Sequence, residues 1–141
     1  MFRDGSGNFS AGVISATATS AQYADLAEKY LADKEYEVGT VMSVGGEKEV
    51  TAAHIGDRAI GVVSANPAYK MNDELVGGTY IALKGRVPVK VFGSVRKGER
   101  LIAANNGIAK VADFSSFPEV FGIALETNDS EDVKLVECVI L

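Results

Sequence analysis

The sequence has no tryptophan, one cysteine, one histidine and three prolines. Its single cysteine, Cys138, cannot form an internal disulfide, and His54 cannot join it in a Cys/His metal cluster at any usual spacing. Without such a cross-link, stability must come from packing or from assembly. The lack of Trp, with only five Tyr, leaves thin support for an aromatic platform that would bind a sugar or a peptide.

Long apolar runs and an excess of positive charge are also missing. No run of about 18 apolar residues exists to span a bilayer, and residues 1–18 lack the basic start and apolar block of a signal peptide. Nineteen acidic residues against fourteen basic ones give a net charge of -5, which repels phosphate backbones. We therefore expect no membrane insertion and no nucleic-acid partner. The basic residues considered for phosphate contact are scattered among acids: Arg58, Arg86, Arg96, Lys97 and Arg100.

The sequence also lacks a catalytic constellation. The candidate nucleophiles are Ser20, Ser64 and Cys138, but His54 is the only imidazole base and lies beside no recognisable nucleophile motif. Alternation in "VKLVECVIL" favours a core position for Cys138 over a reactive thiol. His54 and Asp57 have no further ligands nearby, so a surface turn is the simpler interpretation. We predict no enzyme activity, no cofactor and no metal site.

The sequence does contain enough apolar residues for one folded domain preceded by an arm. Its 141 residues are 47% hydrophobic and 23% charged, a globular composition. The first segment is rich in Gly, Ser, Ala and Thr, and its few large apolar groups cannot bury a core. It is either a mobile tail or an extended arm that a partner chain orders. We divide the chain into an extended arm with a short collar segment, 1–34, and a β-rich globular domain, 35–141.

The segment "YADLAEKY", Tyr23 to Tyr30, joins these two parts. Tyr23, Leu26 and Tyr30 have helical spacing, but the tyrosines could equally alternate with charges along an edge strand, so both interpretations stay open. Beyond Glu35, short runs rich in Val and Ile are bounded by Gly, Asn or Asp turns, which predicts a mainly β fold, a compact barrel or β-clip. These runs are "VGTVMSV", "AIGVVSA", "TYIALKGRVPVKVFG", "ERLIAA", "GIAKVA", "VFGIALET" and "VKLVECVIL".

A weak internal repeat runs through the predicted β domain. "VGTVMSVGGEKEV" followed by "AIGVVSA" has the same order as "KGERLIAANNGIAKV" followed by "VFGIALE". Gly39 and Gly61 are separated nearly as Gly98 and Gly122 are. We therefore expect two similar hairpin halves that meet in one compact sheet.

A long loop, "SANPAYKMNDELVGGTY", lies between these halves. Its Asn-Pro, Asn-Asp and Gly-Gly pairs indicate turns. Tyr69 and Met71 could present a contact surface there, or could only cover the end of the barrel. Both interpretations stay open.

The stretch from "DGSGNFSAGVISATATSAQYADLAEKY" to "RAIGVVSANPAYKMN" resembles structural proteins of tailed bacteriophages. The likeness is to the C-terminal domains of tail fibres, spikes and neck appendages, including self-cleaving chaperone domains. It implies a homotrimer whose arm lies in a threefold shaft, made in the host cytoplasm and carried in the virion. The expected partners are other virion proteins of the tail or capsid and a host surface receptor. In this picture Tyr23, Leu26 and Tyr30 form a collar between chains.

The resemblance implies two alternatives to a tail fibre or appendage component. In the self-cleaving relatives, acidic residues cut the chain just upstream near a serine, which maps to Asp25, Glu28 and Ser20. This segment departs from the aromatic-rich form of those relatives, because Leu26 and Lys29 are interposed. Short glycine-marked strands and "AIGVV" turns also resemble capsid decoration proteins at threefold positions of a head.

Overall fold

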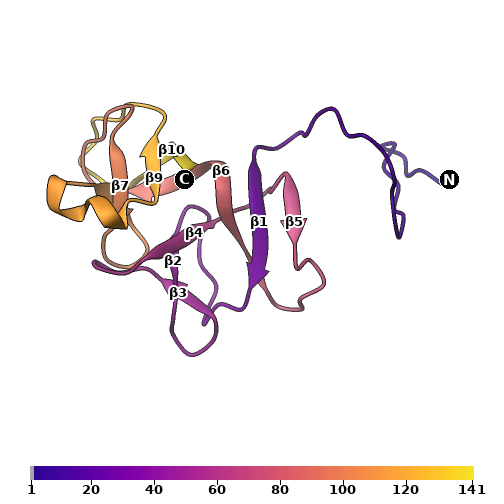
Figure 1. Cartoon of the computed structure of the whole chain (residues 1–141), viewed down its shortest axis with the longest axis horizontal. Coiled ribbons are helices and arrows are strands. Elements are labelled where there is room, and N and C mark those ends of the chain that lie inside the picture. Colours follow the sequence, from indigo (N-terminus) through magenta and orange to yellow (C-terminus); the bar gives the residue numbers. More distant parts are fainter. Residues whose placement is uncertain (1) are drawn as a thin grey trace.

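The computed structural model describes residues 2–141, and Met1, with which the predicted arm begins, lies outside them. Within residues 2–141 the regular structure is ten strands and one 3₁₀ helix, with no α-helix, which confirms the mainly β prediction (Figure 1). The elements are β1 (Asp25–Tyr30), β2 (Val41–Val44), β3 (Val50–Ala52), β4 (Ala59–Val63), β5 (Tyr69–Met71), β6 (Thr79–Val91), β7 (Arg100–Ala103), β8 (Ala109–Val111), η1 (Phe114–Glu119), β9 (Gly122–Ala124) and β10 (Lys134–Ile140).

Five strands close into a barrel in the second part of the chain. The hydrogen-bonded order is β10-β9-β7-β8-β6, and β10 pairs again with β6, which completes the ring. The contact between β6 and β8 is parallel, through Val91 and Ala109, whereas the other pairs of this ring are antiparallel. A closed ring leaves no free edge, so its backbone groups are paired around the circle.

The first part of the chain repeats this arrangement. β6, β4, β2 and β3 follow one another in the sheet, and β1 pairs with β6 on the other side. A parallel bridge between Ala32, just beyond β1, and Val50 of β3 closes this part into a ring as well, and we call it the first barrel and the ring of β6 to β10 the second barrel. The long strand β6 therefore belongs to both rings: residues 79–85 pair with β1, and residues 85–91 pair with β10.

The two rings match residue by residue, which confirms the two similar halves predicted from the sequence. Met42 pairs with Gly61 in the first barrel as Leu101 pairs with Gly122 in the second. Matching backbone hydrogen bonds run from Gly39 to Val63 and from Gly98 to Ala124. Gly39 and Gly98 have nearly equal positive φ angles, 90° and 91°, and so turn the chain into β2 and β7 in the same way.

A second pair of matched glycines marks a close approach of strands. A Cβ on Gly61 would lie 2.1 Å from the Ala82 carbonyl oxygen, and one on Gly122 would lie 3.0 Å from the Val139 carbonyl oxygen. Ala82 and Val139 occupy the same place in their respective rings. The first barrel therefore needs a residue without a side chain at this point, and the second leaves little room for one.

Each barrel has its own core cluster. The first is filled by buried side chains of Ala32, Met42, Val50, Val63 and Ile81, with Tyr30 and Tyr36 packed against them. The larger cluster fills the second barrel with mostly Val and Ala side chains and extends under the shared strand. Small branched side chains suit the narrow interior of a five-stranded ring, because few larger groups fit between facing strands.

The segment "YADLAEKY" forms a strand from Asp25 onward, and the helical alternative is wrong. β1 pairs with β6 along its whole length and with β5 on its other side. Pairing on both edges outweighs the helical preference of this short segment. The sheet thus begins at Asp25 rather than at Glu35. Residues 2–24 contain no helix or strand, are exposed, and lead away from the barrels (Figure 1).

Candidate functional site

The two barrels differ most in the connection that leads to their last strand. In the second barrel, residues 125–133 join β9 to β10 without a further strand. In the first, residues 64–78 join β4 to β6 and include the additional strand β5. Because the second ring closes without such a strand, β5 is an addition to the common unit. It lies beside β1, away from the second barrel (Figure 1).

β5 and β1 together present exposed apolar side chains. The two strands are parallel, and Tyr69 lies directly opposite Leu26. Tyr69 is 65% exposed, Leu26 36% and the preceding Tyr23 46%. We call Leu26 and Tyr69 the apolar patch. The predicted contact role of Tyr69 stays a prediction. Met71, the other predicted residue, is half-buried.

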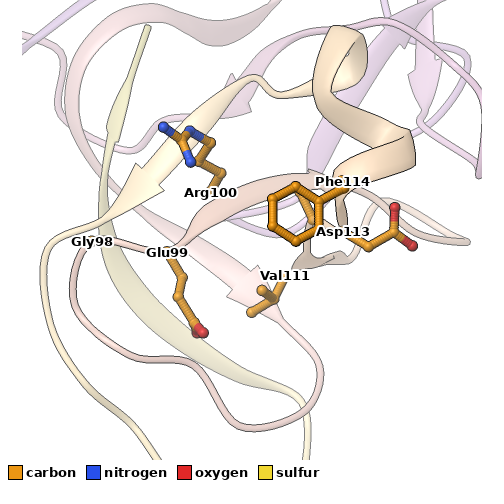
Figure 2. Close-up of a pocket in the computed structure, with 7 residues that line it drawn as sticks. Gly98, Glu99, Arg100, Val111, Asp113 and Phe114 are labelled. Atoms are coloured by element: carbon orange, nitrogen blue, oxygen red, sulfur yellow. The ribbon is translucent and has the colours of Figure 1, made fainter.

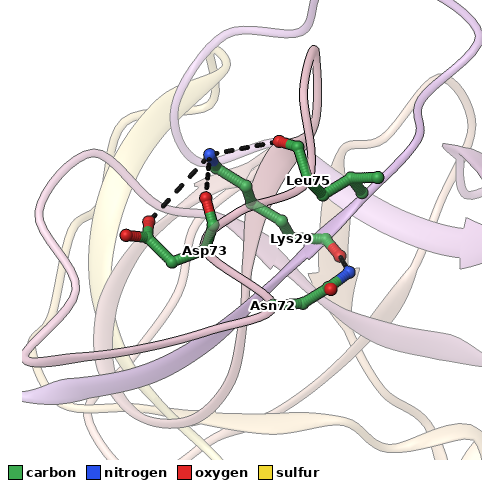
Figure 3. Close-up of polar contacts among 4 residues, drawn as sticks. All are labelled: Lys29, Asn72, Asp73 and Leu75. Carbon is green, nitrogen blue, oxygen red and sulfur yellow. Dashed lines mark hydrogen bonds and ion pairs between the residues drawn. The ribbon is translucent and has the colours of Figure 1, made fainter. Parts of the chain in front are cut away.

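Lys29 of β1 anchors the loop that follows β5 (Figure 3). Its ammonium group donates to the carbonyl oxygens of Asp73 at 2.7 Å and Leu75 at 3.3 Å. The Asn72 side-chain amide donates back to the Lys29 carbonyl oxygen at 3.0 Å. Asn72 has φ of 53°, a left-handed turn conformation that Asn tolerates well. The loop therefore holds β5 in place with several bonds.

A buried polar pair lies where the N-terminal segment meets β1. The Ser64 hydroxyl donates to Asp25 Oδ2 at 2.6 Å, and both residues are buried. The Asp25 carbonyl oxygen also accepts from the Ala68 amide, which ties the start of the long loop to β1. A cavity of about 340 Å³ adjoins the pair, and Tyr23, Arg86 and Glu137 are among its lining residues.

The predicted collar residues do not lie on one surface. Tyr23 and Leu26 are exposed, whereas Tyr30 packs against the core of the first barrel. Burial, together with the neighbouring Glu28, raises the pKa of the Tyr30 hydroxyl to about 12. Packing within its own domain therefore accounts for Tyr30, because its ring is already engaged there.

The residues mapped to self-cleavage are also separated. Asp25 is bonded to Ser64, Glu28 lies beside Tyr30, and Ser20 lies in the exposed segment. The structure thus assigns the two carboxylates to different neighbours. Ser64, which the sequence offered as a nucleophile, is instead the hydrogen-bond partner of Asp25.

Two candidate residues remain, Cys138 and His54. Cys138 is fully buried, and burial raises the pKa of its thiol to about 12. His54 is exposed in a turn where its amide donates to Asp57 Oδ2 at 2.8 Å, as expected for a surface turn. In residues 2–141 no group of three or more His, Cys, Asp and Glu could hold a metal ion. No helix of the described chain is long and apolar enough to cross a membrane.

A polar groove opens beside the first barrel. The Tyr36 hydroxyl donates to Asp33 Oδ1 at 2.6 Å, and the Thr51 hydroxyl donates to Oδ2 at 2.9 Å. The hydrogen bond from Tyr36 first, and that from Thr51 further, lower the pKa of Asp33 against the opposing effect of burial. Across the groove, Lys90 forms an ion pair with Glu37 at 2.5 Å.

The second barrel has a more apolar hollow at one end (Figure 2). The hollow has a volume of about 290 Å³ and lies between the start of β7, the end of β8 and the start of η1. Val111 and the fully exposed ring of Phe114 are among its lining residues. Glu99, Arg100 and Asp113 also line it. This hollow of the second barrel therefore differs from the polar groove beside the first barrel.

The contacts among these residues could not be predicted from the sequence. Asp25 and Ser64 are 39 residues apart, and no local pattern joins them. Lys29 and its loop partners are separated by more than 40 residues. The one available signal was the Asn-Asp turn at residues 72 and 73, which indicated where the loop bends but not what anchors it.

Comparison with known proteins finds no match by sequence but clear matches by structure. No protein-family model and no curated protein matches the chain. The fold is similar to that of pre-mature gene product 12 of bacteriophage phi29, with TM-score 0.70 and 12% identity over 96% of this chain and 23% of that one. It is also similar to a C-terminal fragment of the same gene product, with TM-score 0.65 and 12% identity over 83% of this chain and 100% of the fragment.

A third similar structure is the N base of head fibre gp8.5 of bacteriophage phi29. The TM-score is 0.51 and the identity 18%, over 82% of this chain and 93% of that one. The chain thus has the fold of domains in phage structural proteins, as the resemblance of its sequence predicted. It spans about a quarter of the chain of pre-mature gene product 12 and all of the C-terminal fragment.

Proposed function

We propose that this chain is a non-enzymatic structural component of a phage virion, a homotrimeric part of a tail fibre or appendage that serves assembly and contact with the host surface. The observation that carries the proposal is the fold shared with the whole C-terminal fragment of phi29 gene product 12. The exposed N-terminal segment and the apolar patch provide surfaces that a second copy can bury.

The physical case for assembly rests on the N-terminal segment. Phe9, Val13 and Ile14 are 41%, 90% and 63% exposed in the single chain. Apolar side chains in a segment without a core gain stability only when another surface covers them. A threefold arrangement in which neighbouring chains cover one another's segments would satisfy that requirement.

Native mass spectrometry of the full chain tests the proposal. Three chains of 14.8 kDa give a complex of about 44 kDa, and we expect that species to dominate at micromolar concentration. The control is the same sample under denaturing conditions, which should give one full-length chain. A monomer at every concentration would contradict the trimer and remove the assembly role.

The likeness to a head-fibre base favours a second candidate, a protein that decorates the capsid at threefold positions. Both candidates require a trimer, so the oligomeric state does not separate them. Immunogold labelling of intact particles would do so, because label on the tail supports the first candidate and label on the head the second.

A third candidate, a self-cleaving appendage domain, rests on the resemblance of the segment that contains Asp25, a residue buried at the root of the N-terminal segment. Cleavage would hydrolyse a peptide bond just upstream of Asp25. The denatured mass of freshly purified protein decides the question: loss of about the first twenty residues in the unmodified chain, but not in Asp25→Asn, would support cleavage. A full-length mass after prolonged incubation would exclude it.

A further inference from the structure

The strand β5 is present without being needed for barrel closure. The matched connection of the second barrel, residues 125–133, closes its ring with no such strand. In the first barrel, the bonds from Lys29 and Asn72 nevertheless hold the β5 loop against β1 (Figure 3). A strand that is anchored yet dispensable for the barrel points to a role outside it.

β5 has one free edge. Among residues 2–141 its only strand partner is β1, so the other edge of Tyr69–Met71 faces outward. A free edge exposes unpaired backbone groups, and an extended chain can bind there as an added strand. The exposed Tyr69 and Leu26 lie side by side at this edge and offer apolar contact to such a strand.

The N-terminal segment has the matching properties. Residues 9–14, "FSAGVI", alternate so that Phe9 and Val13 share one face when the chain is extended. Both are exposed, and neither pairs with the barrels of its own chain. The segment enters the fold through Tyr23 and Ala24, immediately before β1 and therefore beside the apolar patch.

The placement of this entry point matters in a trimer. When copies gather around a threefold axis through their N-terminal segments, each segment leaves its own chain next to the β5 edge and passes close to those of its neighbours. The ten residues between Ile14 and Asp25 span up to roughly 35 Å when extended, enough to reach an adjacent copy. The segment of the single chain leads away from its own β5 (Figure 1).

We propose that residues 9–14 of one copy bind the free edge of β5 of a neighbouring copy as an added strand, with Phe9 and Val13 covering Tyr69 and Leu26. This inference rests on the proposed homotrimer and names its interface. The bonds from Lys29 and Asn72 then position the receiving strand, and the N-terminal segment becomes ordered only in the assembly.

Hydrogen exchange on the full chain tests the interface. We expect amides of residues 9–14 and 68–72 to exchange at least tenfold more slowly at a concentration where the trimer dominates than after dilution to monomers. Phe9→Ser with Val13→Ser should abolish this protection and weaken the trimer at least tenfold. The control, Phe2→Ser with Val76→Ser, changes two residues that are 98% and 90% exposed outside the interface and should leave both readouts unchanged.

The possible outcomes separate the inference from the function on which it rests. A stable trimer whose residues 9–14 and 68–72 exchange as fast as in the monomer would overturn the inference and leave the trimeric component standing. Protection that persists in the diluted monomer would assign the segment to its own chain and also overturn it. A chain that never forms trimers would overturn both.

Discussion

The two barrels share a scaffold but differ in what surrounds it. Both have the same strand order, the same glycines at the turn and at the close approach, and matching backbone bonds. Only the first carries β5, the buried Asp25–Ser64 pair and the bond network of Asp33. The shared positions are those that close a five-stranded ring. Of these additions, β5 is where we place contact with another chain.

The matched core positions show that the two barrels keep the same fold although their core residues differ. Ile81 of the first barrel corresponds to Cys138 of the second, and Val50 corresponds to Ala109. All four side chains are fully buried. Interiors tolerate such changes when total volume and patterning are kept, so the barrels need not share residue types to share a fold.

The largest effect should come from the matched glycines. Gly61→Ala places a Cβ 2.1 Å from a backbone oxygen, whereas Gly122→Ala places it at 3.0 Å. We expect the first change to lower the free energy of unfolding by about 3 kcal/mol or more and the second by about 1 kcal/mol. Urea denaturation of both variants measures this. Equal costs would contradict the tighter strand approach in the first barrel.

An intermediate effect should come from the polar pair found only in the first barrel. The position that corresponds to Ser64 is Leu125, whose amide makes the matching backbone bond to Glu137. Ser64→Ala removes the hydroxyl that donates to Asp25, and we expect it to lower the free energy of unfolding by about 2 kcal/mol.

A double-mutant cycle with Asp25→Ala measures this pair directly. The coupling energy should be about 1 kcal/mol or more, because the two side chains bond each other. Additive effects would show that the hydrogen bond contributes little and that the pair does not distinguish the barrels energetically.

The smallest effect concerns the polar groove of the first barrel. Tyr36→Phe removes the hydrogen bond that contributes most to lowering the pKa of Asp33, so this pKa should rise toward the ordinary value of Asp. A lowered folded-state pKa gives stability that is present above the unfolded pKa and is lost as pH falls through the folded one. The free energy of unfolding of the variant should therefore be lower than that of the unchanged protein at neutral pH. It should then fall less than that of the unchanged protein between neutral pH and acid.

NMR titration of the Asp33 carboxyl carbon, followed by thermal melts in acid and at neutral pH, checks this expectation. Lys34→Ala offers a control, since its charge contributes less to the pKa of Asp33 than the Tyr36 hydrogen bond does. An unchanged Asp33 titration in Tyr36→Phe would show that other groups set this pKa.

Much of the fold could be predicted because turns and apolar runs are local signals. The Gly and Asn turns that were predicted to bound the Val- and Ile-rich runs do join β2 to β3, at Gly45 and Gly46, and β7 to β8, at Asn106 and Gly107. β1 could not be assigned, because "DLAEKY" suits a helix and becomes a strand only through pairing with β6 and β5. β5 was missed because a three-residue strand carries little pattern of its own.

The site was less predictable than the fold. The sequence singled out Tyr69 as a loop residue, whereas it begins strand β5, and its pairing with Leu26 is set by a register between segments more than 40 residues apart. Tyr30 was grouped with Tyr23 by helical spacing, and a strand with a bulge after Leu26 separates their surroundings. Side-chain contacts of this kind depend on how distant strands pair, and composition and periodicity do not reveal that pairing.

The shared strand β6 also determines where the first and last strands of the double barrel lie. Asp25 at the start of β1 and Ile140 at the end of β10 both pair with Gly85 in the middle of β6. Their backbones therefore lie within about two strand spacings, roughly 10 Å, of each other. A short linker from Leu141 to Asp25 could join them, so the double barrel is suited to circular permutation, with new ends in an exposed loop such as residues 129–132.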